Sequence, residues 1–250
     1  MPGFRILLNL IILFNLLNCS SEKKEDPIIN KQNILLAGLV YYNSQNQNYN
    51  SECGSGYGKE NSLFYKSGYY DTFVNYKTGT TNLVIGDSTM DISTRYDGYL
   101  SSVSKSIAVG GNTLCDMYIQ FKKIDPTVNN TVISTGGGND LLQDIAFDRI
   151  EAVGRMLLER VNSVRTGKMA VIGIHPTRVD SANANKGEVN KRIKAITESL
   201  SGCFYDPAEL FTLDSSGRAS ESDMLDSIHY NSTISFNIKD KIQIVCSISL

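Results

Sequence analysis

From residue 82 onward, short apolar runs alternate with longer segments whose apolar residues recur at helical spacing. The runs span residues 83–85, 107–109, 132–133, 169–172 and 203–205. They lack polar alternation, which is typical of strands covered on both faces. Helical spacing occurs over residues 141–164, 189–200 and 234–245. This alternation predicts an α/β fold with a parallel, roughly five-stranded sheet and helices on both sides.

Glycine-containing or polar segments follow four of these predicted strands. They are residues 86–88 (Gly-Asp-Ser), 110–113 (Gly-Gly-Asn-Thr), 136–140 (Gly-Gly-Gly-Asn-Asp) and 175–178 (His-Pro-Thr-Arg). In open parallel sheets, ligands bind just beyond the carboxyl ends of the strands. We therefore expect these segments to surround one site.

Ser88 stands at a predicted strand-to-helix turn, where its hydroxyl would project above the sheet. Gly-Asp-Ser is also an ordinary turn sequence. A serine becomes nucleophilic near neutral pH only beside a base, and the chain has two histidines. Asp226 precedes His229 by three residues, near enough to accept the Nδ1 proton and leave Nε2 for Ser88. The pattern predicts a triad with Ser88 as nucleophile, His229 as base and Asp226 as its partner.

His175 has no such neighbour, because Ile172 stands three residues before it. Asp180 could orient its ring only from farther along the loop. We therefore expect His175 to be at the surface or to have a hydrogen-bonded structural role.

Acyl transfer also needs donors for the developing oxyanion. The Ser88 amide, the Gly111 amide and the Asn139 side chain follow neighbouring predicted strands and are the candidates. The alternative interpretation makes residues 112–113 and 139–140 helix N-caps. The order of these segments along the chain favours an oxyanion hole.

These residues resemble the conserved blocks of SGNH/GDSL-type hydrolases over roughly residues 82–250. Ile85-Gly86-Asp87-Ser88 resembles the block that carries the nucleophile, and Gly111 falls on the oxyanion glycine. Residues 137–140 match Gly-x-Asn-Asp and place the oxyanion amide on Asn139, while residues 226–229 match Asp-x-x-His. The resemblance implies a flavodoxin-like three-layer sandwich. It also implies esterase, lipase, thioesterase or carbohydrate-deacetylase activity without a cofactor.

Cleavage of a small-molecule, lipid or glycan ester is therefore the leading prediction. One alternative is an O-acetyltransferase with the same triad and a sugar hydroxyl as acceptor. The other is a non-catalytic surface lipoprotein that uses the fold for binding. An intact set of Ser88, Asp226 and His229 favours catalysis over binding.

The N-terminal residues 1–19 have the features of a signal peptide. Residues 6–17 are apolar, as long as a signal h-region and too short to span a bilayer. The sequence that ends at Cys19 resembles a bacterial lipobox, with Asn18 where a small residue is usual. The alternative is an ordinary secretory signal with an incidental cysteine.

A lipid on Cys19 would anchor the protein to a membrane in the periplasm or at the outer surface. Residues 20–27 are polar and charged, as expected of a tether. Residues 28–81 hold eight of the 13 tyrosines. Disordered linkers are poor in aromatic residues, so we expect this segment to fold. It is either an extension packed on the main domain or a cap that contacts glycans through aromatic rings.

Four cysteines remain besides Cys19, and an exported chain meets an oxidising compartment, so two disulfides are predicted. Of the three possible connectivities, we favour Cys53–Cys115 with Cys203–Cys246. No Cys or His pair has ligand spacing, so no metal site is expected. The formal charge is −2, from 24 Lys and Arg against 26 Asp and Glu, without a basic block. Nucleic acid is therefore not an expected partner.

Overall fold

The computed structural model describes residues 52–54, 57, 82–95, 105–123, 130–134 and 136–249. All of them belong to the compact unit Tyr41–Leu250. The predicted signal peptide, the tether and most of the tyrosine-rich segment lie outside the described residues. No helix within the described ranges is long and apolar enough to cross a membrane.

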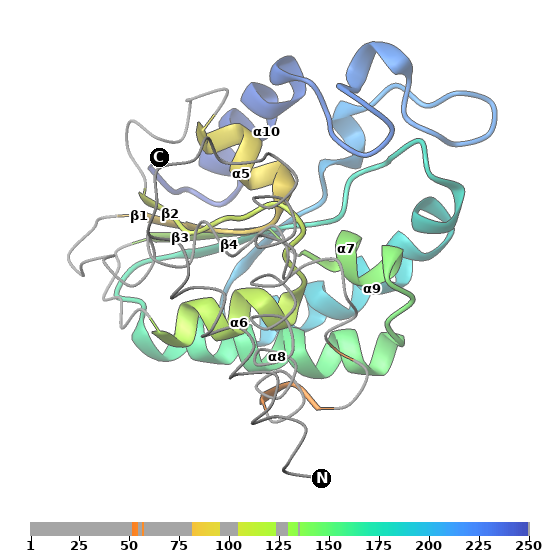
Figure 1. Ribbon diagram of the computed structural model, residues 1–250. Coiled ribbons are helices and arrows are strands. Elements are labelled where there is room, and N and C mark those ends of the chain that lie inside the picture. Colours follow the sequence, from red (N-terminus) through yellow and green to blue (C-terminus); the bar gives the residue numbers. More distant parts are fainter. Residues whose placement is uncertain are drawn as a thin grey trace, which may run out of the picture. The chain divides into compact units, whose positions relative to one another are not determined.

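The described residues contain five strands, which form one sheet (Figure 1). They are β1 (Asn82–Ile85), β2 (Lys105–Ser106), β3 (Asn130–Ser134), β4 (Met169–Ile172) and β5 (Cys203–Tyr205). Their order across the sheet is β2-β1-β3-β4-β5, and every pairing is parallel. The prediction of an α/β fold with a parallel sheet is confirmed. The strand order reverses between β1 and β3, at the switch point where such sheets bind ligands.

Helices cover both faces of the sheet (Figure 1). On one face lie α5 (Ser88–Arg95) and α10 (Ser232–Val245), and on the other α6 (Leu114–Lys123), α8 (Phe147–Val164) and α9 (Asp180–Ser199). The remaining elements are α7 (Gly137–Leu142) and the 3₁₀ helices η1 (Pro207–Leu210) and η2 (Glu221–Asp223).

Alternate residues of the central strands enter two different hydrophobic cores. In β1, Leu83 and Ile85 pack into the core shared with α6 and α8, whereas Val84 packs into the core shared with α10. In β4, Val171 and Ala170 divide in the same way. Each strand is therefore buried on both faces, which explains its unbroken apolar sequence.

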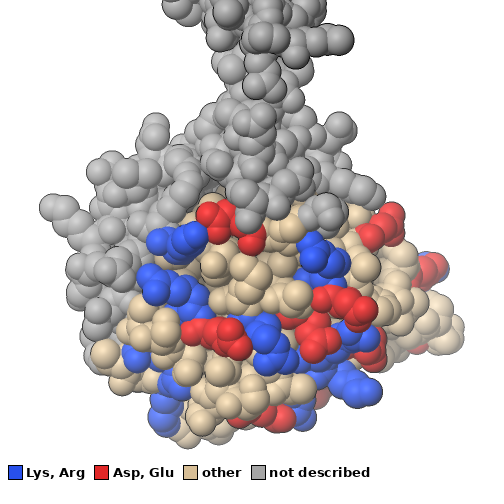
Figure 2. Space-filling model, turned by 90° about the horizontal axis from the view of Figure 1, so that it is seen from below, with Lys and Arg blue, Asp and Glu red and all other residues tan. Residues whose placement is uncertain are grey.

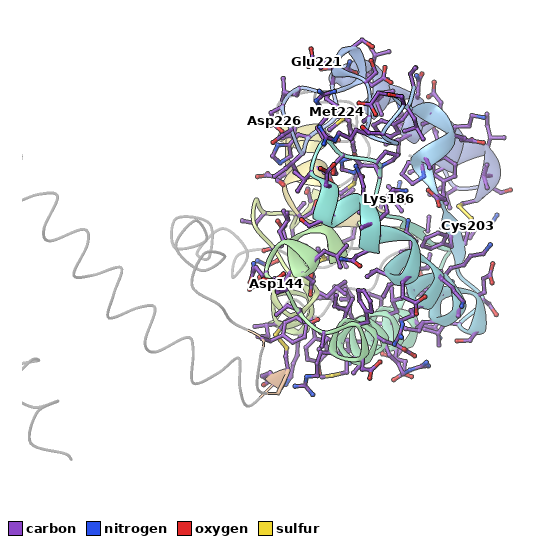
Figure 3. All side chains as sticks on the ribbon, turned by 90° about the vertical axis from the view of Figure 1, so that its right-hand side faces the viewer. Asp144, Lys186, Cys203, Glu221, Met224 and Asp226 are labelled. Atoms are coloured by element: carbon purple, nitrogen blue, oxygen red, sulfur yellow. A yellow bond between two sulfur atoms is a disulfide. The ribbon has the colours of Figure 1, made fainter. Side chains whose placement is uncertain are left out.

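Two disulfides are present, with the predicted pairing. Cys53–Cys115 joins the tyrosine-rich segment to α6, and Cys203–Cys246 joins β5 to the residue after α10. In Figure 3, Cys203 lies far from Asp226.

The described part of the tyrosine-rich segment contacts α6 and α8. Tyr57 is buried in the core that these helices share. Glu52 pairs with Lys122 on α6, and Arg149 on α8 donates to the Cys53 carbonyl (2.9 Å). These contacts and the disulfide hold the described residues of this segment against α6 and α8.

The second strand is placed wrongly by the sequence. It was predicted at residues 107–109 but is β2, Lys105–Ser106. The predicted residues still run beside β1, because Ile107 N donates to Val84 O (2.9 Å) and Val109 N to Gly86 O (3.2 Å). The ladder stops because β1 ends at Ile85, where the chain turns into α5.

Two helix predictions are also corrected. The helix predicted over residues 141–164 is divided into α7 and α8, because Asp144 adopts a left-handed conformation (φ 55°) and the Ile145 amide closes the turn onto Asp140 O (3.0 Å). The helix predicted from residue 189 begins at Asp180. Its first half is polar and mostly exposed, so apolar spacing did not reveal it.

Charges of both signs alternate over the face in Figure 2. Among the ion pairs of the described residues, Arg192 on α9 pairs with Glu188, Asp148 and Glu151. The described residues on this face therefore form no large patch of a single charge sign.

Candidate active site

Ser88 is the first residue of α5 and follows directly on the turn after β1. The Asp87 carboxylate caps this helix, because its Oδ1 accepts from Thr89 N (3.0 Å) and from the Thr89 hydroxyl (2.6 Å). The first amides of a helix have no partner within it. The turn therefore presents both the Ser88 hydroxyl and its amide at the carboxyl edge of the sheet.

Ser88, His229 and Asp226 form a continuous hydrogen-bonded chain. The Ser88 Oγ lies 2.8 Å from His229 Nε2, and His229 Nδ1 lies 2.7 Å from Asp226 Oδ2. Because a carboxylate only accepts, Nδ1 carries the proton and Nε2 can accept from the serine hydroxyl. The structure thus brings together the three residues that the sequence predicts as a triad.

The turn that carries Asp226 and His229 is stabilised by the Asp226 carboxylate itself. Its Oδ1 accepts from the amides of Ile228 and His229, each at 2.7 Å. Partial burial acts to raise the pKa of Asp226, but these hydrogen bonds and the one from the His229 ring outweigh it and lower that pKa. Asp226 therefore stays ionised beside the imidazole.

Asn139 lies in the first turn of α7 and lines the same pocket as Ser88. Its Nδ2 donates to the Asn112 carbonyl at 2.9 Å, which fixes the orientation of the amide. An amide has two N–H groups, so the second remains for a ligand. The alternative interpretation of residues 139–140 as an N-cap is wrong, because α7 begins at Gly137 and its N-cap is Gly136.

The predicted glycine pair after β2 lies beside the nucleophile. Gly111 has a left-handed conformation (φ 79°), which favours glycine. A Cβ added to Gly110 would lie 3.8 Å from the Ser88 Cβ, so Gly110 closely approaches the serine. Among the described residues that line the pocket, neither glycine appears.

Asn112 links these loops, and sequence reasoning missed this role. It is fully buried, and its Nδ2 donates to Gly86 O (2.8 Å) before β1 turns into α5. It also pairs with Gln120 on α6 (2.8 and 3.2 Å). The cap of α6 is instead Thr113, which exchanges hydrogen bonds with Asp116. A polar residue before a helix looks the same in sequence whether it caps the helix or links loops.

The pocket beside Ser88 is mainly apolar and has an empty volume of about 590 Å³ counted out to open solvent. Its apolar walls come from Leu142, Ile172, Ile174, Val179, Ala182 and Ile228. Of the described lining residues, Asp87 is the only Asp or Glu, none is Lys or Arg, and the Asp87 carboxylate accepts from Thr89. Such a pocket suits an uncharged group.

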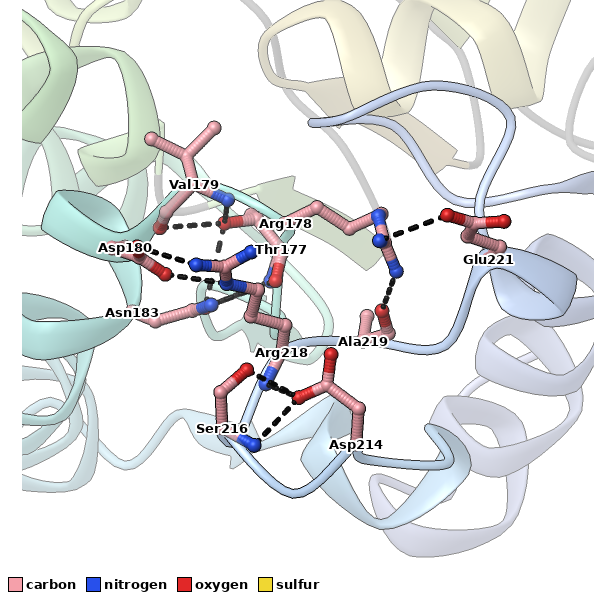
Figure 4. Close-up of polar contacts among 10 residues, drawn as sticks. All are labelled: Thr177, Arg178, Val179, Asp180, Asn183, Asp214, Ser216, Arg218, Ala219 and Glu221. Atoms are coloured by element: carbon pink, nitrogen blue, oxygen red, sulfur yellow. Dashed lines mark hydrogen bonds and ion pairs between the residues drawn. The ribbon is translucent and has the colours of Figure 1, made fainter.

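The outer wall of the pocket is fastened by ion pairs (Figure 4). Arg178 pairs with Glu221 (3.0 Å), and Arg218 binds both carboxylate oxygens of Asp180 (2.6 and 2.7 Å). Both pairs connect residues 177–180 to the loop that precedes the Asp226 turn. These ion pairs therefore hold residues 177–180, which form part of the pocket wall, against the loop on their outer side.

His175 is buried and lines the pocket, with its Nε2 2.7 Å from the Ile228 carbonyl oxygen. The sequence predicts that His175 is either at the surface or in a hydrogen-bonded structural role. The structure shows the hydrogen-bonded role. Among the described residues, no carboxylate pairs with its ring as Asp226 pairs with that of His229.

A buried acid lies directly behind Asn139. Asp140 accepts from Leu114 N at the start of α6 (3.1 Å). The Tyr57 hydroxyl, which donates to the Arg149 carbonyl (3.4 Å), also interacts with the Asp140 carboxyl group. Burial raises the pKa of Asp140 to about 7, against the hydrogen bonds from Tyr57 and Leu114. The tyrosine-rich segment thus reaches the residue next to the candidate oxyanion donor.

No group of three or more His, Cys, Asp or Glu side chains in the described ranges could hold a metal ion.

No family model and no curated protein matches the sequence. Solved structures do match the fold. An acylhydrolase candidate from Bacteroides fragilis has a TM-score of 0.60 at 18% identity, covering 72% of this chain and 94% of that one.

A GDSL-like lipase from Bacteroides thetaiotaomicron has a TM-score of 0.59 at 14% identity, covering 70% of this chain and 96% of that one. An acetylxylan esterase from Geobacillus stearothermophilus has a TM-score of 0.52 at 15% identity, covering 69% and 96%. At such low identity the likeness establishes the fold: this chain shares the α/β architecture of these ester-cleaving proteins.

Proposed function

We propose that this protein is a serine hydrolase of the SGNH/GDSL type that cleaves carboxylic esters. The observation that carries the proposal is the chain of hydrogen bonds from Ser88 through His229 to Asp226 (2.8 and 2.7 Å). A binding protein has no need of a serine hydroxyl aimed at an oriented imidazole.

In the proposed reaction, the Ser88 Oγ attacks the acyl carbon while its proton passes to His229 Nε2. Asp226 stabilises the imidazolium that forms. As the tetrahedral intermediate collapses, His229 returns the proton to the leaving alcohol and an acyl-serine remains. A water molecule, deprotonated by His229, then releases the carboxylic acid and restores Ser88.

The oxyanion of the intermediate would accept hydrogen bonds from the Ser88 amide, the Asn139 side chain and the Gly111 amide. Support comes from the start of α5 at Ser88, and from the bond to Asn112 that orients the Asn139 amide. The apolar pocket favours an uncharged acyl group over a charged one.

The strand order β2-β1-β3-β4-β5 supports a flavodoxin-like sandwich for residues 82–250. The names of the matching structures, an acylhydrolase candidate, a GDSL-like lipase and an acetylxylan esterase, support ester cleavage. We further propose that the enzyme is exported and anchored by lipid on Cys19. Metabolic labelling with a radioactive fatty acid, with Cys19→Ala as control, tests the anchor.

A series of chromogenic esters with increasing acyl length tests the activity, with Ser88→Ala as control. We expect turnover of at least the short esters and labelling of Ser88 by a fluorophosphonate. Neither should occur in Ser88→Ala. A folded wild-type protein that shows neither turnover nor labelling contradicts the proposal.

A further inference from the structure

His175 lies between the pocket and the turn that carries Asp226 and His229. It follows β4, is 7% exposed and lines the pocket. The backbone just before it is clamped, because the Asn190 side chain on α9 accepts from Ile174 N (2.8 Å) and donates to Ile174 O (3.0 Å). The backbone beside the imidazole is therefore held in place by α9.

The His175 Nε2 atom is 2.7 Å from the carbonyl oxygen of Ile228, the residue before His229. A carbonyl oxygen only accepts, so Nε2 carries the proton and donates it. A second bond reaches the same turn, since Arg178 N donates to the Ser227 carbonyl (2.9 Å). Of these two bonds, only the one from His175 depends on a side chain.

The surroundings of His175 keep it neutral and fixed. Its ring is stacked on Phe211 at 5.6 Å between centroids and meets Tyr230 edge-on at 4.8 Å. Burial lowers the pKa of His175 to about 4, although the Ile228 carbonyl and the nearby Asp87 carboxylate act to raise it. A neutral imidazole has a single proton, and the Ile228 carbonyl holds that proton on Nε2.

The turn is anchored at its two ends, where Met224 and Tyr230 pack into a hydrophobic core, but the side chains between them are partly exposed. The Asp226 side chain is 51% exposed and the His229 side chain 21%. Ser88, by contrast, is set by the junction of β1 and α5. A bond from the buried loop after β4 is therefore well placed to fix His229 relative to Ser88.

We propose that His175 is a positioning residue for the base: through the Ile228 carbonyl it holds His229 at hydrogen-bonding distance from Ser88. This role rests on the ester hydrolysis proposed above. The hydrogen bond itself can be measured without turnover, so the two proposals can fail separately.

Two variants separate the donor of His175 from its ring. His175→Phe keeps a ring against Phe211 and Tyr230 but leaves the Ile228 carbonyl without a donor. His175→Gln keeps an N–H group near the Nε2 position but loses the ring. We expect kcat for a chromogenic ester to fall roughly tenfold to a hundredfold in His175→Phe with little change in KM, since displacements of about 1 Å can cost about 100-fold.

His175→Gln should retain most of the wild-type kcat, even if its midpoint of thermal unfolding is lower. Two results overturn the proposal. One is wild-type kcat in His175→Phe. The other is an equal loss of kcat in both variants that follows the unfolded fraction at the assay temperature.

Nuclear magnetic resonance of ¹⁵N-labelled histidine provides the second measurement, and only two imidazoles contribute to the spectrum. His175 should show the neutral tautomer with the proton on Nε2 from pH 5 to pH 8. The hydrogen-bonded Nδ1 proton of His229 should exchange faster in His175→Phe than in His175→Gln. A proton on His175 Nδ1, or equal exchange in both variants, overturns the role of His175. Absence of ester turnover in the wild type overturns only the proposed function.

Discussion

The Ser88 Oγ lies 2.8 Å from the His229 Nε2, although 141 residues separate the two in the chain. Ser88 belongs to the turn between β1 and α5, and His229 to an irregular segment before α10. No local preference brings them together, so their contact depends on the whole α/β fold and on the residues that orient the imidazole. Asp226 is the nearest of these residues.

Asp226→Asn should lower kcat by about four orders of magnitude, as an equivalent substitution does in a serine protease triad. The amide oxygen would accept from the Ile228 and His229 amides, as Oδ1 does now, so the NH₂ group would face Nδ1 and donate to it. The ring then carries its proton on Nε2, which can no longer accept from Ser88. Steady-state kinetics on a short chromogenic ester measure the loss. Asp240→Asn, an exposed change on α10, is the matched control and should leave kcat unchanged. A kcat within tenfold of the wild type in Asp226→Asn contradicts the assignment.

Asn139→Ala should lower kcat by about 100-fold to 1000-fold, because one oxyanion donor is lost. KM should change little, since the oxyanion forms only after substrate has bound. The protein should stay folded, as one hydrogen bond contributes about 1 kcal/mol to stability. Asn185→Ala on the exposed part of α9 serves as the control. If Asn139→Ala turned over ester at the wild-type rate, another donor would occupy the oxyanion hole.

Much of this architecture could be predicted from the sequence because burial on both faces leaves an unbroken apolar pattern. β4 and β5 coincide with the predicted residues 169–172 and 203–205. The first half of α9 was missed because it is polar and exposed, and the break before α8 depends on one left-handed residue, Asp144. The spacing of apolar residues reveals neither the polar half of α9 nor the break at Asp144.

The residues of the candidate site also fall into a group that the sequence predicts and a group that it does not. Residues with a distinctive chemical spacing, Ser88, Asp226 and His229, were predicted, and the structure places them together. Asn112 and Asn190 were not, because a buried amide that bonds to backbone has no sequence pattern of its own. Their partners are set by tertiary packing, which only the folded chain defines.

Removing the Cys53–Cys115 disulfide should lower the free energy of unfolding by about 4 kcal/mol, because the bond closes a loop of 62 residues in the unfolded chain. Removing Cys203–Cys246, with a separation of 43 residues, should cost a similar amount. Paired Cys→Ser variants and urea unfolding measure both losses. Of the two removals, only that of Cys53–Cys115 should also increase proteolysis near residues 52–57, because this disulfide joins that part of the chain to α6. Equal proteolysis of the two variants would contradict this role.

Asp140→Asn should change the pH dependence of stability. The pKa of Asp140 is about 7 in the folded protein, against an ordinary value of 3.8, so the folded state binds its proton more tightly. The wild type is therefore stabilised by this group below about pH 4 and loses that contribution as the pH rises to about 7. His175, with its pKa lowered to about 4, acts in the opposite direction between pH 4 and 6.5, but it is present in both proteins and cancels in their difference.

The amide of Asp140→Asn carries no charge and can still accept from Leu114 N. The variant should therefore gain stability relative to the wild type between pH 5 and pH 8, as measured by urea unfolding at each pH. Asp144→Asn, an exposed change in the turn after α7, should show no such gain and is the control. A constant difference between Asp140→Asn and the wild type over this range would mean that Asp140 is already ionised in the folded protein at pH 5.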